Sequence, residues 1–301
     1  MPQARQAHLL RVIVLFVLLS PAVSAQPDLT PQIRLLPPVE STKLRLDDLS
    51  DDELVQLYES EYRDSLVQQS VDQSRLVSRQ GAVIEIGYSF SDRTDDLGFE
   101  YQTHTFPELL LRYRVRDSIE LRLGWAGTTS DIFADPLTGF EDHDQTLADP
   151  SFGVRFALFQ QNGWRPTMSL TTSTSVAMND RNTAGSGFRP QAALSYSWLT
   201  GPDCLLTGST GVTWITAGPD DFFDLQQSIA LNYFVNDRWD VFIEWFAVFP
   251  GGDGGLSAAH SAGPGVSCAL NDRLQLTLNA AAGLNDAASD VLAQVRVAWR
   301  L

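Results

Sequence analysis

From Gly81 to Leu301 the sequence alternates between apolar and polar side chains with a period of two, and this limits the fold more than any other feature. In the stretch WDVFIEWFAVF (239–249), Asp240 and Glu244 interrupt an apolar run at the same parity. An unpaired carboxylate is costly in an apolar core, so the core of a soluble sandwich suits this stretch poorly. A strand with one face in lipid and the other on a polar lumen accommodates both kinds of side chain.

Twelve segments carry this alternation and are rich in aromatic and β-branched residues, as strands are. The expected strands are 81–90, 106–116, 118–127, 149–159, 165–177, 188–198, 204–215, 225–235, 239–249, 260–270, 273–284 and 290–301. Short polar turns join them at one end, and longer polar loops such as 91–105 and 128–148 join them at the other. This asymmetry is typical of outer-membrane barrels. The sequence therefore predicts an all-β fold, a twelve-stranded antiparallel transmembrane up-and-down β-barrel over 81–301.

Aromatic residues fall near both ends of the expected outward faces. Trp125 and Trp214 lie at the long-loop ends, whereas Trp239 and Trp299 lie at the short-turn ends. Rings at both ends are typical of membrane-interface girdles. In an ordinary sandwich, the alternative fold, aromatic residues would gather in the middle of the strands. The distribution favours the barrel.

The first 25 residues have basic residues, an apolar run from Leu9 to Leu19, and small residues before Gln26. This layout predicts a secretory signal peptide over 1–25. A membrane anchor is the alternative, although a spanning helix needs about 20 apolar residues. We therefore expect an exported protein that resides in a Gram-negative-type outer membrane.

Residues 26–80 have a different composition from the rest and are expected to lie in the periplasm. A proline-rich linker comes first, and an acidic amphipathic segment follows in which Ser50 and Glu53 fit a capping box. The segment predicts an N-terminal periplasmic helix. It either binds a periplasmic partner through residues 45–77, plugs the barrel mouth, or forms a weakly ordered leader.

The charge of the chain excludes one class of partner. The formal net charge is −16, and Lys43 is the only lysine. Nucleic-acid binding needs clustered basic residues, so we expect no nucleic-acid partner. Two cysteines, Cys204 and Cys268, are too few for a disulfide framework, and whether they pair is left open. No phosphate-binding or zinc-binding motif occurs, so no cofactor and no metal are expected.

The side chains expected to line the lumen are charged or carry amides, and they share the polar parity of their strands. They are Arg112, Arg114, Glu120, Arg122, Arg155, Asn232, Asp240, Glu244, Gln275, Asn279, Gln294 and Arg296. Arginines on one wall and carboxylates on another would select permeants by charge. The alternative is that these groups neutralise one another and fill a narrow lumen.

An outer-membrane enzyme of the lipase or protease type is the main rival class. His260 and Ser261 begin an expected strand near the outer rim, but the surrounding residues lack the spacing of such enzymes. The acidic stretch Asp142-His143-Asp144 could offer oxygen ligands to a divalent cation, and a solvated loop is the simpler account. We expect no catalytic residues. A structural or interaction barrel is the third class.

Four stretches carry a resemblance to a known family. They are LADPSFGVRFALF (147–159), NDRWDVFIEW (236–245), GPGVSCALNDRLQLTLNAAAGLND (263–286) and VRVAWRL (295–301). They resemble the outer-membrane proteins named after the meta-pathway of phenol degradation, with Asp149, Glu244 and Asn285 at the matching positions. The resemblance covers most of 81–301 and implies a porin-like transporter for small molecules, hydrophobic or aromatic compounds among them. The expected partners are therefore outer-membrane lipid and a small-molecule permeant.

Overall fold

The computed structural model describes residues 81–95, 98–176, 189–217, 220–251 and 257–301, without the side chains of 215–222. The predicted signal peptide, the linker and the periplasmic helix lie outside the described residues. Among the residues that are described, no helix is long and apolar enough to cross a membrane.

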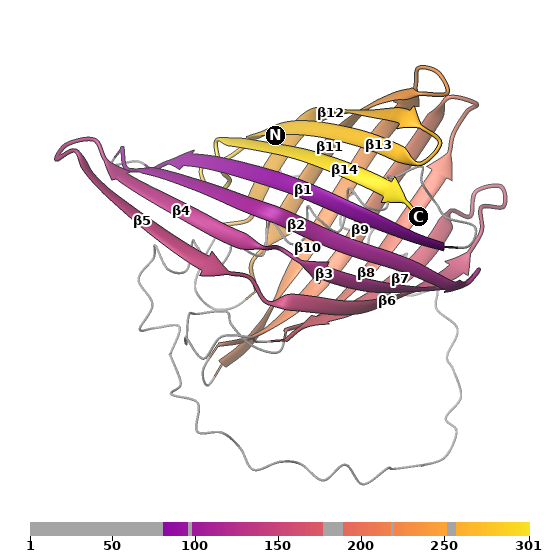
Figure 1. Cartoon of the computed structure of the whole chain (residues 1–301), viewed down its shortest axis with the longest axis horizontal. Coiled ribbons are helices and arrows are strands. Elements are labelled where there is room, and N and C mark those ends of the chain that lie inside the picture. The colour runs from indigo at the N-terminus through magenta and orange to yellow at the C-terminus, as the bar shows by residue number, and fades with distance from the viewer. Residues whose placement is uncertain (1–80, 96–97, 177–188, 218–219, 252–256) are drawn as a thin grey trace, which may run out of the picture. The chain divides into compact units, whose positions relative to one another are not determined.

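The described chain is a single antiparallel sheet that closes on itself (Figure 1). Its strands are β1 (Gly81–Thr94), β2 (Glu100–Arg116), β3 (Ile119–Trp125), β4 (Thr128–Asp135), β5 (Phe140–Leu147), β6 (Pro150–Phe159), β7 (Thr167–Ser175), β8 (Arg189–Leu199), β9 (Cys204–Ala217), β10 (Asp220–Phe234), β11 (Trp239–Phe249), β12 (Ala259–Asn271), β13 (Leu274–Gly283) and β14 (Val291–Arg300). β1 pairs with both β14 and β2, which closes the ring. Closure leaves no unpaired backbone edge within the ring, as a membrane-spanning sheet requires.

Twelve of these strands form the barrel, and they match the twelve predicted segments with small shifts at their ends. The remaining two, β4 and β5, form a hairpin outside the ring, so the prediction of a loop over 128–148 was wrong. β2 continues well beyond the end of β3, and this continuation pairs with β4 from Glu100↔Ala134 to Phe106↔Thr128. The other edge of this continuation pairs with β1, so the hairpin supplies backbone partners to the edge that would otherwise be unpaired.

A glycine makes the change of direction between β3 and β4. Gly127 has a φ of 67°, in the left-handed region that favours glycine. A Cβ at this position would also lie 2.4 Å from the carbonyl oxygen of Pro107 on β2. The base of the hairpin is closed by the Trp125 indole, whose Nε1 donates to the Ala148 carbonyl at 2.9 Å. Close packing therefore fixes where the chain leaves the barrel.

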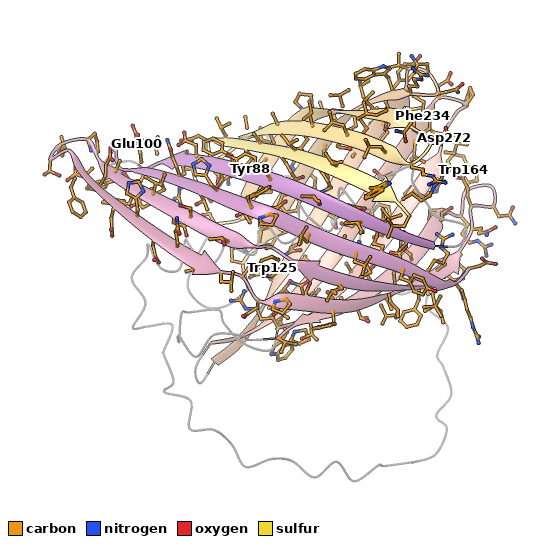
Figure 2. The ribbon with its side chains drawn as sticks, in the orientation of Figure 1. Tyr88, Glu100, Trp125, Trp164, Phe234 and Asp272 are labelled. Carbon is orange, nitrogen blue, oxygen red and sulfur yellow. The ribbon has the colours of Figure 1, made fainter. Side chains whose placement is uncertain are left out.

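Two other predicted loops are shorter than expected. β1 and β2 continue their pairing through Ser91↔Thr103 to Thr94↔Glu100, so most of the expected loop 91–105 is strand. β9 and β10 likewise pair as far as Ala217↔Asp220. Figure 2 shows the two ends of the barrel, with Glu100 at the long-loop end and Trp164 and Asp272 at the short-turn end.

The alternation of side chains is inverted relative to a soluble protein. On β11, Val241 and Ile243 are 43% and 60% exposed, whereas Asp240 and Glu244 are 4% and 8% exposed. The exposed Ile243 lies opposite the equally outward Leu231 of β10. The apolar face therefore forms the outer surface, and the polar face surrounds the lumen, as the sequence predicts.

One polar cluster stands on the outer surface. The Gln227 amide donates from Nε2 to the Tyr196 hydroxyl at 2.7 Å, and its Oε1 accepts from the Thr210 hydroxyl at 2.7 Å. Gly208 makes room for the ring, because a Cβ there would lie 2.5 Å from Tyr196. Mutual hydrogen bonding satisfies an amide that faces hydrocarbon, where an unpaired polar group is costly.

Candidate functional site

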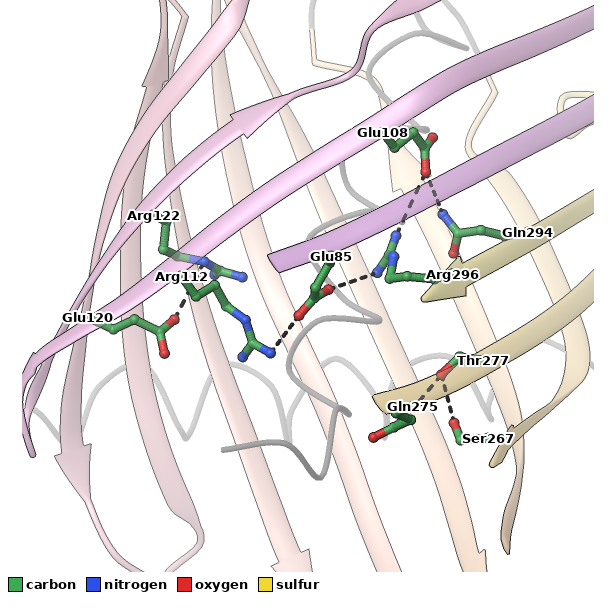
Figure 3. Close-up of polar contacts among 10 residues, drawn as sticks. All are labelled: Glu85, Glu108, Arg112, Glu120, Arg122, Ser267, Gln275, Thr277, Gln294 and Arg296. Atoms are coloured by element: carbon green, nitrogen blue, oxygen red, sulfur yellow. Dashed lines mark hydrogen bonds and ion pairs between the residues drawn. The ribbon is translucent and has the colours of Figure 1, made fainter. Parts of the chain in front are cut away.

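One wall of the lumen, formed by β14, β1, β2 and β3, is charged (Figure 3). Glu85 on β1 lies between two arginines, with Oε1 2.5 Å from Arg112 Nη2 and Oε2 3.9 Å from Arg296 Nη1. The three residues are at most 5% exposed. Because β1 pairs with β2 on one side and with β14 on the other, its inward carboxylate can contact a guanidinium from each neighbour.

Glu108 adds a second carboxylate to this wall. Its Oε2 lies 3.9 Å from Arg296 Nη2 and accepts from Gln294 Nε2 at 3.2 Å, while its Oε1 accepts from the Ser89 hydroxyl at 2.7 Å. Gly87 on β1 leaves the space that this side chain fills, because a Cβ there would lie 2.9 Å from Glu108 Oε2. Sequence reasoning did not include Glu108, although it shares the parity of Arg112.

Two arginines lie directly opposite each other on β2 and β3, in the register pair Arg112↔Arg122. Like charges at this spacing destabilise a sheet, and carboxylates offset the repulsion. Glu85 pairs with Arg112, and Glu120 Oε1 lies 3.8 Å from Arg122 Nε. The arginines therefore do not form a purely basic wall, because each has an acidic neighbour on the same side of the lumen.

The opposite wall carries small hydroxyl side chains. Register places four serines side by side across four strands, through Ser169↔Ser195, Ser195↔Ser209 and Ser209↔Ser228. We call these four residues the serine row. The Ser209 and Ser228 hydroxyls are 3.2 Å apart. In the order of the ring, β8, β9 and β10 lie across from β14, β1 and β2, and Figure 1 shows these two sets of strands on opposite sides.

A cavity of about 60 Å³ lies against the serine row. Arg155 from β6 and Glu244 from β11 line it as well, one from each flank of the row. Arg155 Nε donates to the Ser169 hydroxyl at 2.9 Å. The serine row was not among the predicted site residues, because Ser and Thr give little contrast between the two faces of a strand.

The twelve predicted lumen residues all lie at the parity of the buried polar face. Eight are buried: Arg112, Arg122, Asn232, Asp240, Glu244, Gln275, Gln294 and Arg296. The other four, Arg114, Glu120, Arg155 and Asn279, are partly exposed.

The structure brings together two groups of the predicted residues. Arg112 and Arg296 share Glu85, and Glu120 contacts Arg122. Others have local roles, such as Asn232, which donates to the Leu205 carbonyl and the Thr207 hydroxyl at 3.2 Å each. Their role in passing a solute remains a prediction.

The residues considered for catalysis, His260, Ser261 and His143, do not form a common site. The His260 ring packs on the outward aromatic side chains of Trp245 and Phe249, at ring-centre distances of 5.8 and 5.6 Å. Ser261, the next residue, is 1% exposed on the inner face. His143 on β5 is exposed, with Nε2 3.9 Å from Glu141 Oε2.

Metal-binding and disulfide chemistry were also considered from the sequence. Within the described ranges, no group of three or more His, Cys, Asp or Glu side chains is arranged to hold a metal ion. Cys204 and Cys268 are free thiols on β9 and β12.

Residues 75–301 match the model of a protein family described as "Putative MetA-pathway of phenol degradation". The chain belongs to this family. Two of the positions that carry the resemblance have clear places in this member of the family. Glu244 lines the lumen cavity, and Asn285 connects neighbouring segments, accepting from the His260 amide at 3.0 Å and donating to the Ala258 carbonyl at 2.6 Å. No curated protein matches the sequence significantly.

A solved structure shares the fold of this chain at low sequence identity. The chain is similar to the translocator domain of the autotransporter NalP from Neisseria meningitidis, with 9% identity and a TM-score of 0.56 over 84% of this chain and 98% of that one. The NanC porin is matched at 10% identity and a TM-score of 0.48, over 73% and 100% of the two chains. The CymD monoaromatic hydrocarbon channel is matched at 9% identity and 0.42, over 74% and 89%. The likeness to the NalP translocator domain shows that this chain has the fold of an outer-membrane barrel.

Proposed function

We propose that this protein is an outer-membrane channel through which small molecules pass without energy coupling. The observation that carries the proposal is the division of the lumen into two walls. Large charged side chains of β14, β1, β2 and β3 occupy one wall, whereas serine and threonine side chains make up most of the lining of the cavity on the other, with Arg155 and Glu244 at its flanks. Small side chains leave room beside a charged surface, which is the arrangement that a selective aqueous path needs.

The charged wall is proposed to select permeants by charge. Arg112, Arg122 and Arg296 contribute three positive charges there, and Glu85, Glu108 and Glu120 contribute three negative charges at contact distances. A solute near this wall meets closely spaced charges of both signs rather than one dominant sign. The proposal therefore favours weak ion selectivity, which single substitutions can shift in either direction.

Hydrophobic or aromatic compounds are proposed as one class of permeant. The family description supports this class, and so does a small apolar cluster of Phe246, Val248 and Leu292 on the inner face. Its three side chains are 2–4% exposed, and other apolar side chains of the inner face, such as Phe242 and Leu110, are buried as well. No enzymatic activity is proposed, since His260 and Ser261 point to opposite faces of β12.

Planar-bilayer recording of the purified full-length protein tests the proposal. We expect discrete conductance steps in KCl, and we expect Arg112→Ala and Arg122→Ala to shift the reversal potential toward cation selectivity. A folded protein that inserts and shows no conductance would contradict the channel function. Unchanged reversal potentials in both variants would contradict the role of the charged wall.

A further inference from the structure

The cavity beside the serine row has a composition that points to a particular kind of ligand. Serine and threonine contribute most of its lining: Thr167, Ser169, Ser195, Ser197, Thr207, Ser209 and Ser228. A hydroxyl both donates and accepts hydrogen bonds. A solute that contacts several of these groups at once is best matched when its own groups also donate and accept, and hydroxyl groups do so.

The two charged residues at the cavity, Arg155 and Glu244, restrict the class of ligand further. Arg155 can only donate hydrogen bonds, and an ionised Glu244 can only accept them. Arg155 favours an acceptor on the ligand, and Glu244 favours a donor. An anionic solute would be attracted by Arg155 and repelled by Glu244, and a cationic solute would meet the reverse. A neutral solute with several hydroxyl groups suits both.

The environment of Glu244 indicates that the cavity is a binding site and not only a gap in the packing. Its side chain lines the cavity and the residue is 8% exposed; the charge of Arg296 acts on its carboxylate, but no hydrogen bond or close ion pair joins that carboxylate to another residue of the described ranges. Buried carboxylates in proteins normally have hydrogen-bond partners. The neighbours across the strands do not supply one, because Glu244 lies opposite Ala230 on β10 and Gly263 on β12.

We propose that this cavity binds neutral polyhydroxylated solutes of polyol or sugar type as they pass through the lumen. The inference rests on the proposed channel function and adds a substrate class to it. The serine row supplies hydrogen bonds along one side of the solute, Arg155 binds an acceptor at one flank, and Glu244 binds a donor at the other. Apolar contact is not required at this site, so it is distinct from the Phe246, Val248 and Leu292 cluster.

Binding is measured directly on the folded full-length protein in detergent by saturation-transfer NMR. Xylitol is the probe, and an oligoether of similar size, which accepts hydrogen bonds but donates none, is the reference solute. The test variant is Ser209→Ala/Ser228→Ala. The matched control is Ser267→Ala/Thr277→Ala, since these two hydroxyls are 3.0 Å apart in the lumen but do not line the cavity (Figure 3).

We expect the wild type and the control to bind xylitol in preference to the oligoether. The Ser209→Ala/Ser228→Ala variant should bind xylitol about fivefold more weakly for each hydrogen bond lost. Equal binding of both solutes, or equal loss in the test and control variants, would overturn the proposal and leave the cavity as a water-filled part of the lumen.

A charged analogue tests the role of Glu244. A sugar acid of similar size should bind the wild type more weakly than xylitol, and Glu244→Gln should restore its binding, because the repulsion of the carboxylates is removed. No gain in this variant would contradict the assignment. Conductance of the same preparations separates the two proposals. A conducting barrel without xylitol binding refutes only this inference, whereas binding without conductance refutes the channel and leaves the cavity as a binding site without transport.

Discussion

Glu85 holds two buried arginines in place, and its neutralisation is the sharpest test of the charged wall. Glu85→Gln keeps the shape of the side chain and removes the charge that faces Arg112 Nη2 at 2.5 Å and Arg296 Nη1 at 3.9 Å. Removing one partner of a buried ion pair costs about 3–5 kcal/mol, because the other charge is left uncompensated. Arg296 keeps its contact with Glu108, so most of the loss comes from Arg112.

A cost of this size corresponds to a change of about 150-fold to 5000-fold in the ratio of folded to unfolded protein. Urea unfolding in lipid vesicles, followed by tryptophan fluorescence, measures the free energy of unfolding. The double variant Glu85→Gln/Arg112→Met should recover a large part of the loss, since it removes both charges of the closest pair. A loss below about 1 kcal/mol in Glu85→Gln, or no recovery in the double variant, would refute the reasoning.

Three further predictions concern the outer surface and the hairpin. Tyr196→Phe should lower the free energy of unfolding by about 1–2 kcal/mol, because Gln227 loses an acceptor on the lipid side; Tyr233→Phe, at another outward position, is the control, and equal effects would contradict the account. Gly127→Ala should disturb the base of the β4–β5 hairpin while the barrel stays folded, which limited proteolysis detects as cleavage near 128–147; an intact hairpin would show that the close approach to Pro107 is not needed. Hydrogen bonds from Thr138 and Leu137 lower the pKa of Asp135, so the stabilisation of this turn is present at neutral pH and lost as the pH falls through that lowered value. The amides of Leu137 and Thr138 should therefore be less protected from exchange in strong acid than at neutral pH. If the wild type and Asp135→Asn protect these amides equally at neutral pH, the account is refuted.

The barrel itself could be predicted because lipid imposes its pattern on every strand. On β11 the contrast between Ile243 and Glu244 is between hydrocarbon and a polar lumen, and nothing outside the strand is needed to see it. The β4–β5 hairpin could not be predicted in this way. Its partner is the far half of β2, and its exposed faces lie outside the ring, where no apolar alternation is required.

The candidate site could be predicted only in part, for a related reason. Parity places Arg112 and Glu244 on the inner face, but it does not say which carboxylate meets which arginine. That depends on register across the point where the sheet closes, where β1 joins residues more than 180 positions apart, as in the pair of Gln294 and Glu108. The serine row depends on register too, because four ordinary strand serines become a row only when β7 to β10 align.

The most direct test of the account is a pair of cysteine substitutions on β11, in a background where Cys204 and Cys268 are replaced by serine. Single-channel current is recorded while a charged, membrane-impermeant thiol reagent is added. We expect Glu244→Cys to show a stepwise fall in current and Ile243→Cys to show none, because the first side chain lines the lumen and the second faces lipid. A fall in current for Ile243→Cys with none for Glu244→Cys, or equal effects in both, would contradict the claim that the polar face of β11 lines the lumen and the apolar face meets lipid.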